Sequence, residues 1–199
     1  MNKMYETYKG ALPFTMPFDL ENGFCGDVLS SKRRLSDVKD IFGDAQSALE
    51  ILKHGDPLVY EFYELNLIEH PGDLDFGTSI VYPGKVGNEY YMTKGHFHTI
   101  LETAEVYYCL KGHGYMLMEN PEGDWYAEEM VPGRTVYVSK RFAHRSINVG
   151  AEPMITFFVY RSDAGHDYGT IATKGYRKLI VEQGGKPVVI DNPKWEEHK

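Results

Sequence analysis

The chain has 199 residues, enough for one domain to bury a hydrophobic core without help from disulfides or metal ions. Its formal net charge of −8 and its sequence pI of about 5.5 argue against nucleic acid as a partner, because a phosphate-rich polymer would be repelled over most of the surface. A small phosphorylated metabolite is compatible with this charge, since a few local donors or cations can bind one anion.

The sequence gives no sign of a membrane segment or of secretion. No stretch approaches the roughly 20 apolar residues of a membrane helix, and residues 1–10 lack the apolar run of a signal peptide. Cys25 and Cys109 are far apart and form no C-x-x-C pair, which suits buried thiols in a reducing compartment. We therefore expect a cytoplasmic protein.

Helical patterning is confined to the first quarter of the chain. Residues 1–35 are predicted to be extended, with glycine and proline breaks. A helical pattern follows at 36–53, where Asp44 can cap a segment whose apolar residues share one face. Gly43 is expected to divide this region into two short helices.

From residue 58 onward, short runs of β-branched and aromatic residues alternate with turn residues at intervals of roughly 8 to 12 residues. This spacing is typical of an antiparallel sandwich or barrel. The predicted strands are 58–67, 78–82, 89–97, 105–110, 114–118, 135–138, 145–148, 154–160, 176–182 and 187–190. The predicted turns are 83–84, 111–112, 120–123, 132–133 and 149–150.

No repeat, low-complexity tract or long linker divides the chain, so we predict a single domain over 1–199. Within it we expect an N-terminal extension over about 1–57, a metal-binding barrel over 58–171 and C-terminal strands over 172–199. The two ends should wrap around the barrel or pair with it. They are also natural material for the interface of a homodimer.

Four residues have the spacing of a metal site. His96 and His98 stand at i and i+2, so in a strand both would project from one face toward one ion. Glu105 follows in the order H-x-H-x6-E, and His144 stands at the start of another predicted strand. Three imidazoles and one carboxylate suit Fe(II), Mn, Ni or Zn better than Mg or Ca. We predict one divalent metal ion, with Fe(II) favoured, and structural roles for the histidines at 54, 70, 113 and 198.

The ligands and the glycines between them resemble the two consecutive motifs of the cupin superfamily, over about residues 80–160. The match departs at Tyr90, where the first motif usually has glycine, and at Ser139 and Arg141, which replace a usual proline and glycine. The gap between the second histidine and the glutamate is longer than the common cupin spacing. The resemblance implies an all-β cupin fold, a jelly-roll β-barrel or sandwich.

That long gap is the spacing of a narrower family, the archaeal-type cupin phosphoglucose isomerases. Five segments of the chain resemble this family: LVYE at 58–61, YPGKVG at 82–87, TKGHFH at 93–98, AEVY at 104–107 and DAGHDYGTI at 163–171. The combination of TKGHFH with DAGHDYGTI is specific. The resemblance implies an aldose–ketose isomerase of glycolysis and gluconeogenesis that interconverts glucose 6-phosphate and fructose 6-phosphate.

This reaction moves hydrogen between C1 and C2 of the opened sugar. By resemblance, Glu105 is the base of a cis-enediol route in which the metal stabilises charge on O1 and O2, with direct hydride transfer as the alternative. His166 is the second catalytic candidate, for ring opening or for moving a proton between O1 and O2. It could instead stabilise a glycine-rich turn, the role expected of Asp163 and Asp167.

The family places the phosphate among hydroxyls and backbone amides, which by resemblance belong here to Tyr60, Ser79, Thr93, Gly95 and Tyr168. Tyr107 and Tyr160 are expected at the sugar end, unless they are plain core aromatics. Lys94 is predicted to alternate to the opposite strand face, and the basic run 32–34 to be a solvated surface.

Two other functions stay open on the residues alone. The four-ligand site would also permit an Fe(II)-dependent cupin dioxygenase, because one fold hosts many chemistries. A non-catalytic sugar-binding cupin is the second alternative. Oxygen uptake with substrate would identify the former, and absence of turnover the latter.

Overall fold

The computed structural model describes residues 13–24, 26, 28–66 and 71–195. The strands are β1 (Ser31–Arg34), β2 (Leu58–Glu64), β3 (Leu74–Val81), β4 (Lys85–Val86), β5 (Glu89–Tyr90), β6 (Phe97–His98), β7 (Glu105–Lys111), β8 (Gly114–Glu119), β9 (Trp125–Met130), β10 (Thr135–Val138), β11 (Ala143–Asn148), β12 (Met154–Arg161), β13 (His166–Asp167), β14 (Lys178–Gln183) and β15 (Lys186–Asp191). The helices are α2 (Leu35–Val38), the 3-10 helix η1 (Lys39–Ile41), α3 (Ala45–His54) and α4 (Gly169–Lys174).

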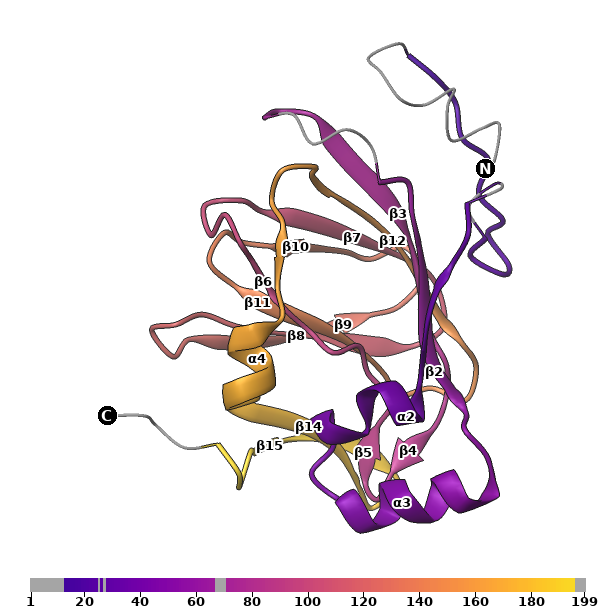
Figure 1. Cartoon of the computed structure of the whole chain (residues 1–199), viewed down its shortest axis with the longest axis vertical. Coiled ribbons are helices and arrows are strands. Elements are labelled where there is room, and N and C mark those ends of the chain that lie inside the picture. The colour runs from indigo at the N-terminus through magenta and orange to yellow at the C-terminus, as the bar shows by residue number, and fades with distance from the viewer. Residues whose placement is uncertain (1–12, 25, 27, 67–70, 196–199) are drawn as a thin grey trace.

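Two antiparallel sheets form the body of the protein. A six-stranded sheet has the order β1-β2-β3-β12-β7-β10, and a three-stranded sheet has the order β11-β8-β9. A two-stranded pair, β13-β6, and a four-stranded sheet, β15-β14-β5-β4, complete the arrangement. Figure 1 shows the helices α2 and α3 gathered at one end of the strands. The predicted all-β cupin fold with short N-terminal helices is confirmed.

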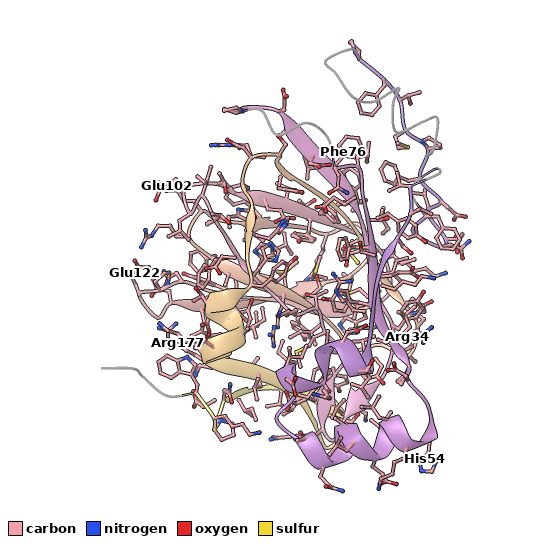
Figure 2. The ribbon with its side chains drawn as sticks, in the orientation of Figure 1. Arg34, His54, Phe76, Glu102, Glu122 and Arg177 are labelled. Carbon is pink, nitrogen blue, oxygen red and sulfur yellow. The ribbon has the colours of Figure 1, made fainter. Side chains whose placement is uncertain are left out.

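The core lies between the sheets, where side chains fill the interior (Figure 2). Met116, Met154 and Cys109 are completely buried there. The prediction of a buried thiol is therefore confirmed for Cys109, whereas Cys25 lies outside the described residues. Among the residues that the structure describes, no helix has the length and apolar character needed to cross a bilayer.

The helical region is divided as predicted. Asp44 accepts a hydrogen bond from the Ser47 backbone N–H at 2.9 Å and so caps α3, while Gly43 stands between this helix and η1. The Gly43 N–H donates a hydrogen bond to Glu89 Oε1 at 2.5 Å, which ties this junction to β5.

Both ends of the described chain pair with the barrel, as expected. β1 pairs with β2, and β14 of the C-terminal hairpin pairs with β5 through Val181 and Glu89. These contacts are within one chain. The homodimer stays a prediction.

Several predicted elements need correction. The segment 89–97 is not one strand: β5 ends at Tyr90, β6 begins at Phe97, and between them Gly95 adopts a φ of +76°. The strands β1, β4, β9 and β13 and the helix α4 were not predicted. β1 and β9 carry charged or exposed residues in place of an apolar alternation, and α4 is a short helix within a glycine-containing segment. The predicted strand 58–67 ends earlier, at Glu64, and its last residue lies outside the described ones.

Candidate active site

Strand register brings the four predicted metal ligands together. His96 and His144 face each other in an isolated antiparallel bridge, with the His144 N–H donating to the His96 carbonyl at 3.1 Å. His98, on β6, pairs with His166 of β13. Glu105 begins β7 opposite Tyr160 of β12. Because cross-strand partners lie on the same face of a sheet, these residues converge on one point.

The four side chains form a compact cluster. One donor atom from each of His96, His98, Glu105 and His144 lies within 4.8 Å of the others. Glu105 Oε2 lies 3.0 Å from His144 Nε2 and 3.1 Å from His98 Nε2. His98, Glu105 and His144 are buried and His96 is half-buried, so the cluster opens toward a pocket on the side of His96.

The hydrogen bonds behind the cluster decide which ring nitrogens face it. The Thr103 hydroxyl donates to the Ile100 carbonyl at 2.7 Å, so it accepts from His98 Nδ1, which lies 2.7 Å away. Nδ1 of His144 lies 3.4 Å from the Phe142 carbonyl, an acceptor. Whenever either ring is neutral, this contact favours the proton on Nδ1 and directs the lone pair of Nε2 into the cluster.

This arrangement fits a divalent cation. A lone pair on Nε2 of His98 faces a carboxylate oxygen at 3.1 Å, and two acceptors repel unless a proton or a cation lies between them. Nε2 of His96 and of His144 are buried without a well-directed hydrogen-bond partner among the described residues. Three imidazoles with a carboxylate suit a divalent transition metal or zinc, and the outward Nδ1 contacts are typical of metal-ligating histidines.

The electrostatics of the cluster keep its ligands in metal-binding form. Burial by itself raises the pKa of Glu105, but the adjacent His144 and His98 outweigh it and hold that pKa well below its usual range. Burial, with His144 and His166 nearby, lowers the pKa of His96 well below its usual range. At neutral pH the carboxylate is therefore ionised and the His96 imidazole neutral.

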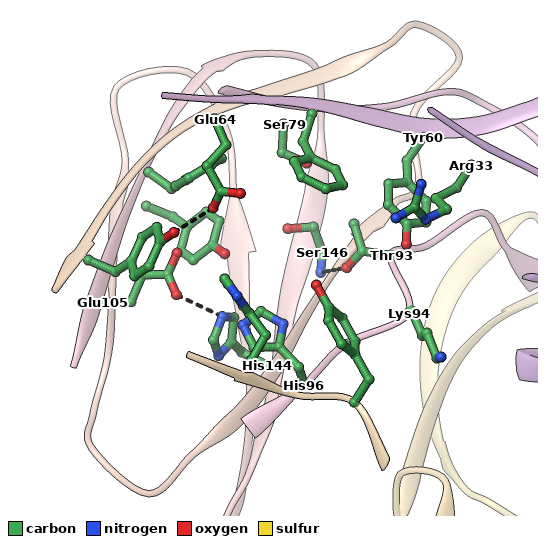
Figure 3. Close-up of a pocket in the computed structure, with 17 residues that line it drawn as sticks. Arg33, Tyr60, Glu64, Ser79, Thr93, Lys94, His96, Glu105, His144 and Ser146 are labelled. Atoms are coloured by element: carbon green, nitrogen blue, oxygen red, sulfur yellow. Dashed lines mark hydrogen bonds and ion pairs between the residues drawn. The ribbon is translucent and has the colours of Figure 1, made fainter. Parts of the chain in front are cut away.

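A pocket of about 200 Å³ opens beside the cluster (Figure 3). All the predicted substrate-binding residues line it: Tyr60, Ser79, Thr93, Gly95, Tyr107, Tyr160 and Tyr168. His166 lines it as well, together with His96, Glu105 and His144, whereas His98 is not among the lining residues. The fold therefore brings all the residues predicted to bind substrate to one cavity.

One end of the pocket offers hydroxyl donors. Thr93 Oγ1 accepts a hydrogen bond from the Ser146 N–H at 3.0 Å, which leaves the hydroxyl proton of Thr93 available to a ligand. Burial raises the pKa of Tyr60, and burial together with Tyr60 raises the pKa of Tyr168 to about 12. Both phenols are therefore neutral donors at neutral pH.

Gly95 brings the backbone close to this end. Its φ of +76° favours glycine, and an added Cβ would lie 2.5 Å from the Tyr176 hydroxyl oxygen and 3.1 Å from Arg145 Cβ. Lys94 lines the pocket, in contrast to the predicted strand alternation, because this irregular backbone breaks the period of two. Its ammonium lies 5.4 Å from the centre of the Tyr168 ring.

His166 and Asp167 are neighbours in sequence but have different positions: His166 lies against the cluster, and Asp167 supports the turn. The His166 ring stacks on Tyr168 at 5.9 Å between centres and meets His96 edge-on at 4.5 Å, which places it against the cluster. Asp167 accepts from the Gly169 N–H at 2.9 Å and from the Thr170 hydroxyl at 2.7 Å, so it holds the start of α4. Asp163 pairs with Arg161 instead of facing the pocket.

Other histidines lie away from the cluster. His54 projects from α3 on the outside of the molecule (Figure 2), 3.4 Å from Glu50. His113 lies 3.1 Å from Glu129. The structural roles predicted for both agree with these positions, and His70 and His198 lie outside the described residues.

Three polar lining residues were missed: Arg33, Glu64 and Ser146. The prediction of a solvated basic run is wrong for Arg33, which pairs with Tyr60 across β1 and β2 and so shares its face. The other two could have been found from alternation. Glu64 stands four residues after Tyr60 in one strand, and Ser146 stands two residues after His144 in another.

Comparison with known proteins agrees with the resemblance predicted from the motifs. A family model described as glucose-6-phosphate isomerase matches residues 32–196. Glucose-6-phosphate isomerase of Thermococcus litoralis is 51% identical over 92% of this chain and 96% of its own length, and that of Pyrococcus furiosus is 48% identical over 92% and 97%. The putative glucose-6-phosphate isomerase 1 of Rhizobium meliloti is 36% identical over 98% and 90%.

Two solved structures show remote likenesses to this chain. An oxalate oxidase matches with a TM-score of 0.43 and 14% identity, over 51% of this chain and 49% of that chain. An oxalate decarboxylase of Bacillus subtilis matches with a TM-score of 0.42 and 20% identity, over 52% and 26%. On the family match and the sequence relatives, this chain belongs to the glucose-6-phosphate isomerase family.

Proposed function

We propose that the protein is a metal-dependent glucose-6-phosphate isomerase that interconverts glucose 6-phosphate and fructose 6-phosphate in the pocket beside the histidine cluster. The predicted enzyme class, an aldose–ketose isomerase, is confirmed by the family to which the chain belongs. The observation that carries the proposal is that one pocket joins a cluster of metal donors to a set of neutral hydroxyl donors.

The hydroxyl-lined end is the proposed phosphate site. Tyr60, Tyr168 and Thr93 can each donate a hydrogen bond to phosphate oxygens, and Gly95 exposes the backbone between Lys94 and His96. Arg33 adds a cation beside Tyr60, which the sequence had not assigned to this site. A dianionic phosphate is favoured at this end because donors and positive charge coincide there.

The cluster end is the proposed site of hydrogen transfer. Four residues, His96, His98, Glu105 and His144, would hold one divalent metal ion. Such an ion, with Fe(II) favoured and Zn, Ni or Mn as alternatives, supplies Lewis acidity that stabilises negative charge on substrate oxygens. The pKa of Glu105 lies well below its usual range, so its carboxylate is ionised at neutral pH, and a role as base requires that substrate binding raises this pKa.

We propose a cis-enediol route in which Glu105 removes the proton from C2 and returns it to C1. A carboxylate that binds a metal tightly is a poor base, so substrate oxygens must weaken its hold. His166 faces the pocket next to His96 and is positioned to move a proton between O1 and O2 or to assist ring opening. Tyr107 and Tyr160 line the same end.

A coupled assay of glucose 6-phosphate formation from fructose 6-phosphate tests the proposal. The protein should lose activity after EDTA treatment and regain it when a single metal is added back. Absence of isomerase activity with every metal, in protein shown by circular dichroism to be folded, would refute the proposed function. Oxygen uptake in place of isomerisation would identify the dioxygenase alternative.

The role of Glu105 is tested by Glu105→Gln. If Glu105 is the base, turnover should fall by a factor of at least about 10² while fructose 6-phosphate binding, measured by calorimetry on metal-loaded protein, changes little. Metal content of the variant is the control. Equal losses of metal, binding and turnover would show a ligand without a role as base.

We also propose that the enzyme is a cytoplasmic homodimer. Large aromatic side chains are exposed on β7, β9 and β10, namely Tyr108, Trp125, Tyr126 and Tyr137, and such surfaces often mark contacts with other chains. Sedimentation equilibrium should give twice the 22.7 kDa mass of one chain. A mass of one chain over the micromolar range would contradict the dimer.

A further inference from the structure

Glu64 is a carboxylate in the pocket that the proposed mechanism does not use. It is the last residue of β2, and its alternation with Phe62 and Tyr60 places all three on the pocket face. Figure 3 shows the Glu64 carboxylate directed into the cavity. The Tyr160 hydroxyl donates to Glu64 Oε1 at 2.6 Å, which fixes the side chain and leaves further acceptor capacity on the carboxylate.

Basic and acidic side chains lie on opposite sides of the pocket. The basic lining residues Arg33 and Lys94 lie on one side of the cavity, and the acidic residues Glu64 and Glu105 lie on the other (Figure 3). Tyr60 and Glu64 are four residues apart in one strand, a span of roughly 13 Å at 3.3 Å per residue. Glu64 therefore stands at the end of the pocket opposite to the proposed phosphate site.

The charge at this end depends on Glu64. With a divalent ion, the cluster of three neutral imidazoles and the Glu105 carboxylate would carry a net charge of about +1. Such a site would attract any second phosphate on the substrate. Burial raises the pKa of Glu64 and the hydrogen bond from Tyr160 opposes this, and in its ionised form Glu64 would cancel that excess.

We propose that Glu64, held by Tyr160, is a specificity-determining residue that rejects a second phosphate at the metal end of the pocket. The pocket then takes hexose monophosphates in one orientation and discriminates against hexose bisphosphates. This inference rests on the proposed function, because that function defines which end receives the phosphate.

The test compares two ligands that differ only by a phosphate on O1. Fructose 6-phosphate and fructose 1,6-bisphosphate are titrated into the metal-loaded protein by calorimetry, with competition against fructose 6-phosphate where binding is weak. Wild-type protein should bind the monophosphate at least tenfold more tightly. Glu64→Gln keeps the shape and an acceptor for Tyr160 but removes the charge, so it should tighten bisphosphate binding about tenfold and change monophosphate binding less than threefold.

Two further variants test whether the effect comes from the charge of Glu64 and not from the loss of any surface charge. Glu64→Asp keeps the charge and should keep the preference for the monophosphate. Glu50→Gln removes the same charge from the exposed face of α3, outside the pocket, and should leave both affinities as in the wild type. Inorganic phosphate titrated into metal-free protein probes the basic end alone, and it should bind Glu64→Gln as it binds the wild type.

Three outcomes would overturn the inference. Wild-type protein that binds the bisphosphate as tightly as the monophosphate refutes it without any variant. If folded Glu64→Gln has the same ratio of the two affinities as the wild type, the inference is refuted. The proposed function still stands in that case, provided that the wild type shows isomerase activity. Failure of the wild type to bind or convert fructose 6-phosphate with any metal would overturn the proposed function and this inference together.

Discussion

One hydroxyl group, that of Thr103, sets the orientation of a predicted metal ligand. It lies 2.7 Å from His98 Nδ1, closer than the Thr103 carbonyl at 3.2 Å, and as the nearer acceptor it turns Nε2 toward Glu105. Thr103→Val removes this acceptor while keeping the shape, so we expect metal affinity to fall ten- to a hundredfold. Thr103→Ser should retain the affinity. Competition with a chromogenic chelator measures both, and equal affinity of the Val variant and the wild type would show that the contact does not orient the ring.

Burial makes Cys109 a poor nucleophile. The side chain is completely buried and its pKa is raised to about 11, chiefly by burial. At pH 8 only about 0.1% of such a thiol is ionised, so alkylation by iodoacetamide should be about a hundredfold slower than for a free cysteine. Mass spectrometry of the peptide containing Cys109 measures the rate, with urea-unfolded protein as the control. Equal rates in native and unfolded protein would contradict this prediction.

At the scale of elements, the segment between β5 and β6 differs most from its prediction, because Gly95 interrupts a sequence that otherwise resembles a strand. Gly95→Ala should cost about 2 to 5 kcal/mol of unfolding free energy, from backbone strain together with the clash against Tyr176. Gly133 has a comparable φ of +90° but nothing within 4 Å of an added Cβ, so Gly133→Ala should show the strain alone, about 1 to 2 kcal/mol. Urea unfolding measures both. Equal losses would show that crowding at Gly95 is absent.

Whole elements were predicted well where the local pattern is strong. Asp44 and the apolar face of α3 indicated both the helix and its first residue. β9 was missed, since only its last residue is buried and it carries two adjacent glutamates, Glu128 and Glu129. Such a strand is held by pairing with β8 instead of by its own periodicity.

At the scale of the whole molecule, the core and the cluster are separate sources of stability. The buried apolar side chains between the sheets form a continuous hydrophobic core, so removal of metal should abolish activity while the fold persists. After EDTA treatment we expect an unchanged far-ultraviolet circular dichroism spectrum and cooperative unfolding. Adding metal should raise the melting temperature in proportion to the logarithm of its concentration above Kd. Loss of cooperative unfolding without metal would show that the ion is needed to fold.

The sequence by itself determined the chemistry of the cluster. The spacing of His96, His98 and Glu105 is local, and the distant His144 follows from the second motif; the structure brings all four to one point. Only the tertiary structure revealed the other polar lining of the pocket. Arg33 reaches it through the register between β1 and β2, and Glu64 is fixed there by Tyr160, 96 positions away in the chain. Periodicity specifies which face of a strand a residue occupies, but register between distant strands decides what that face meets.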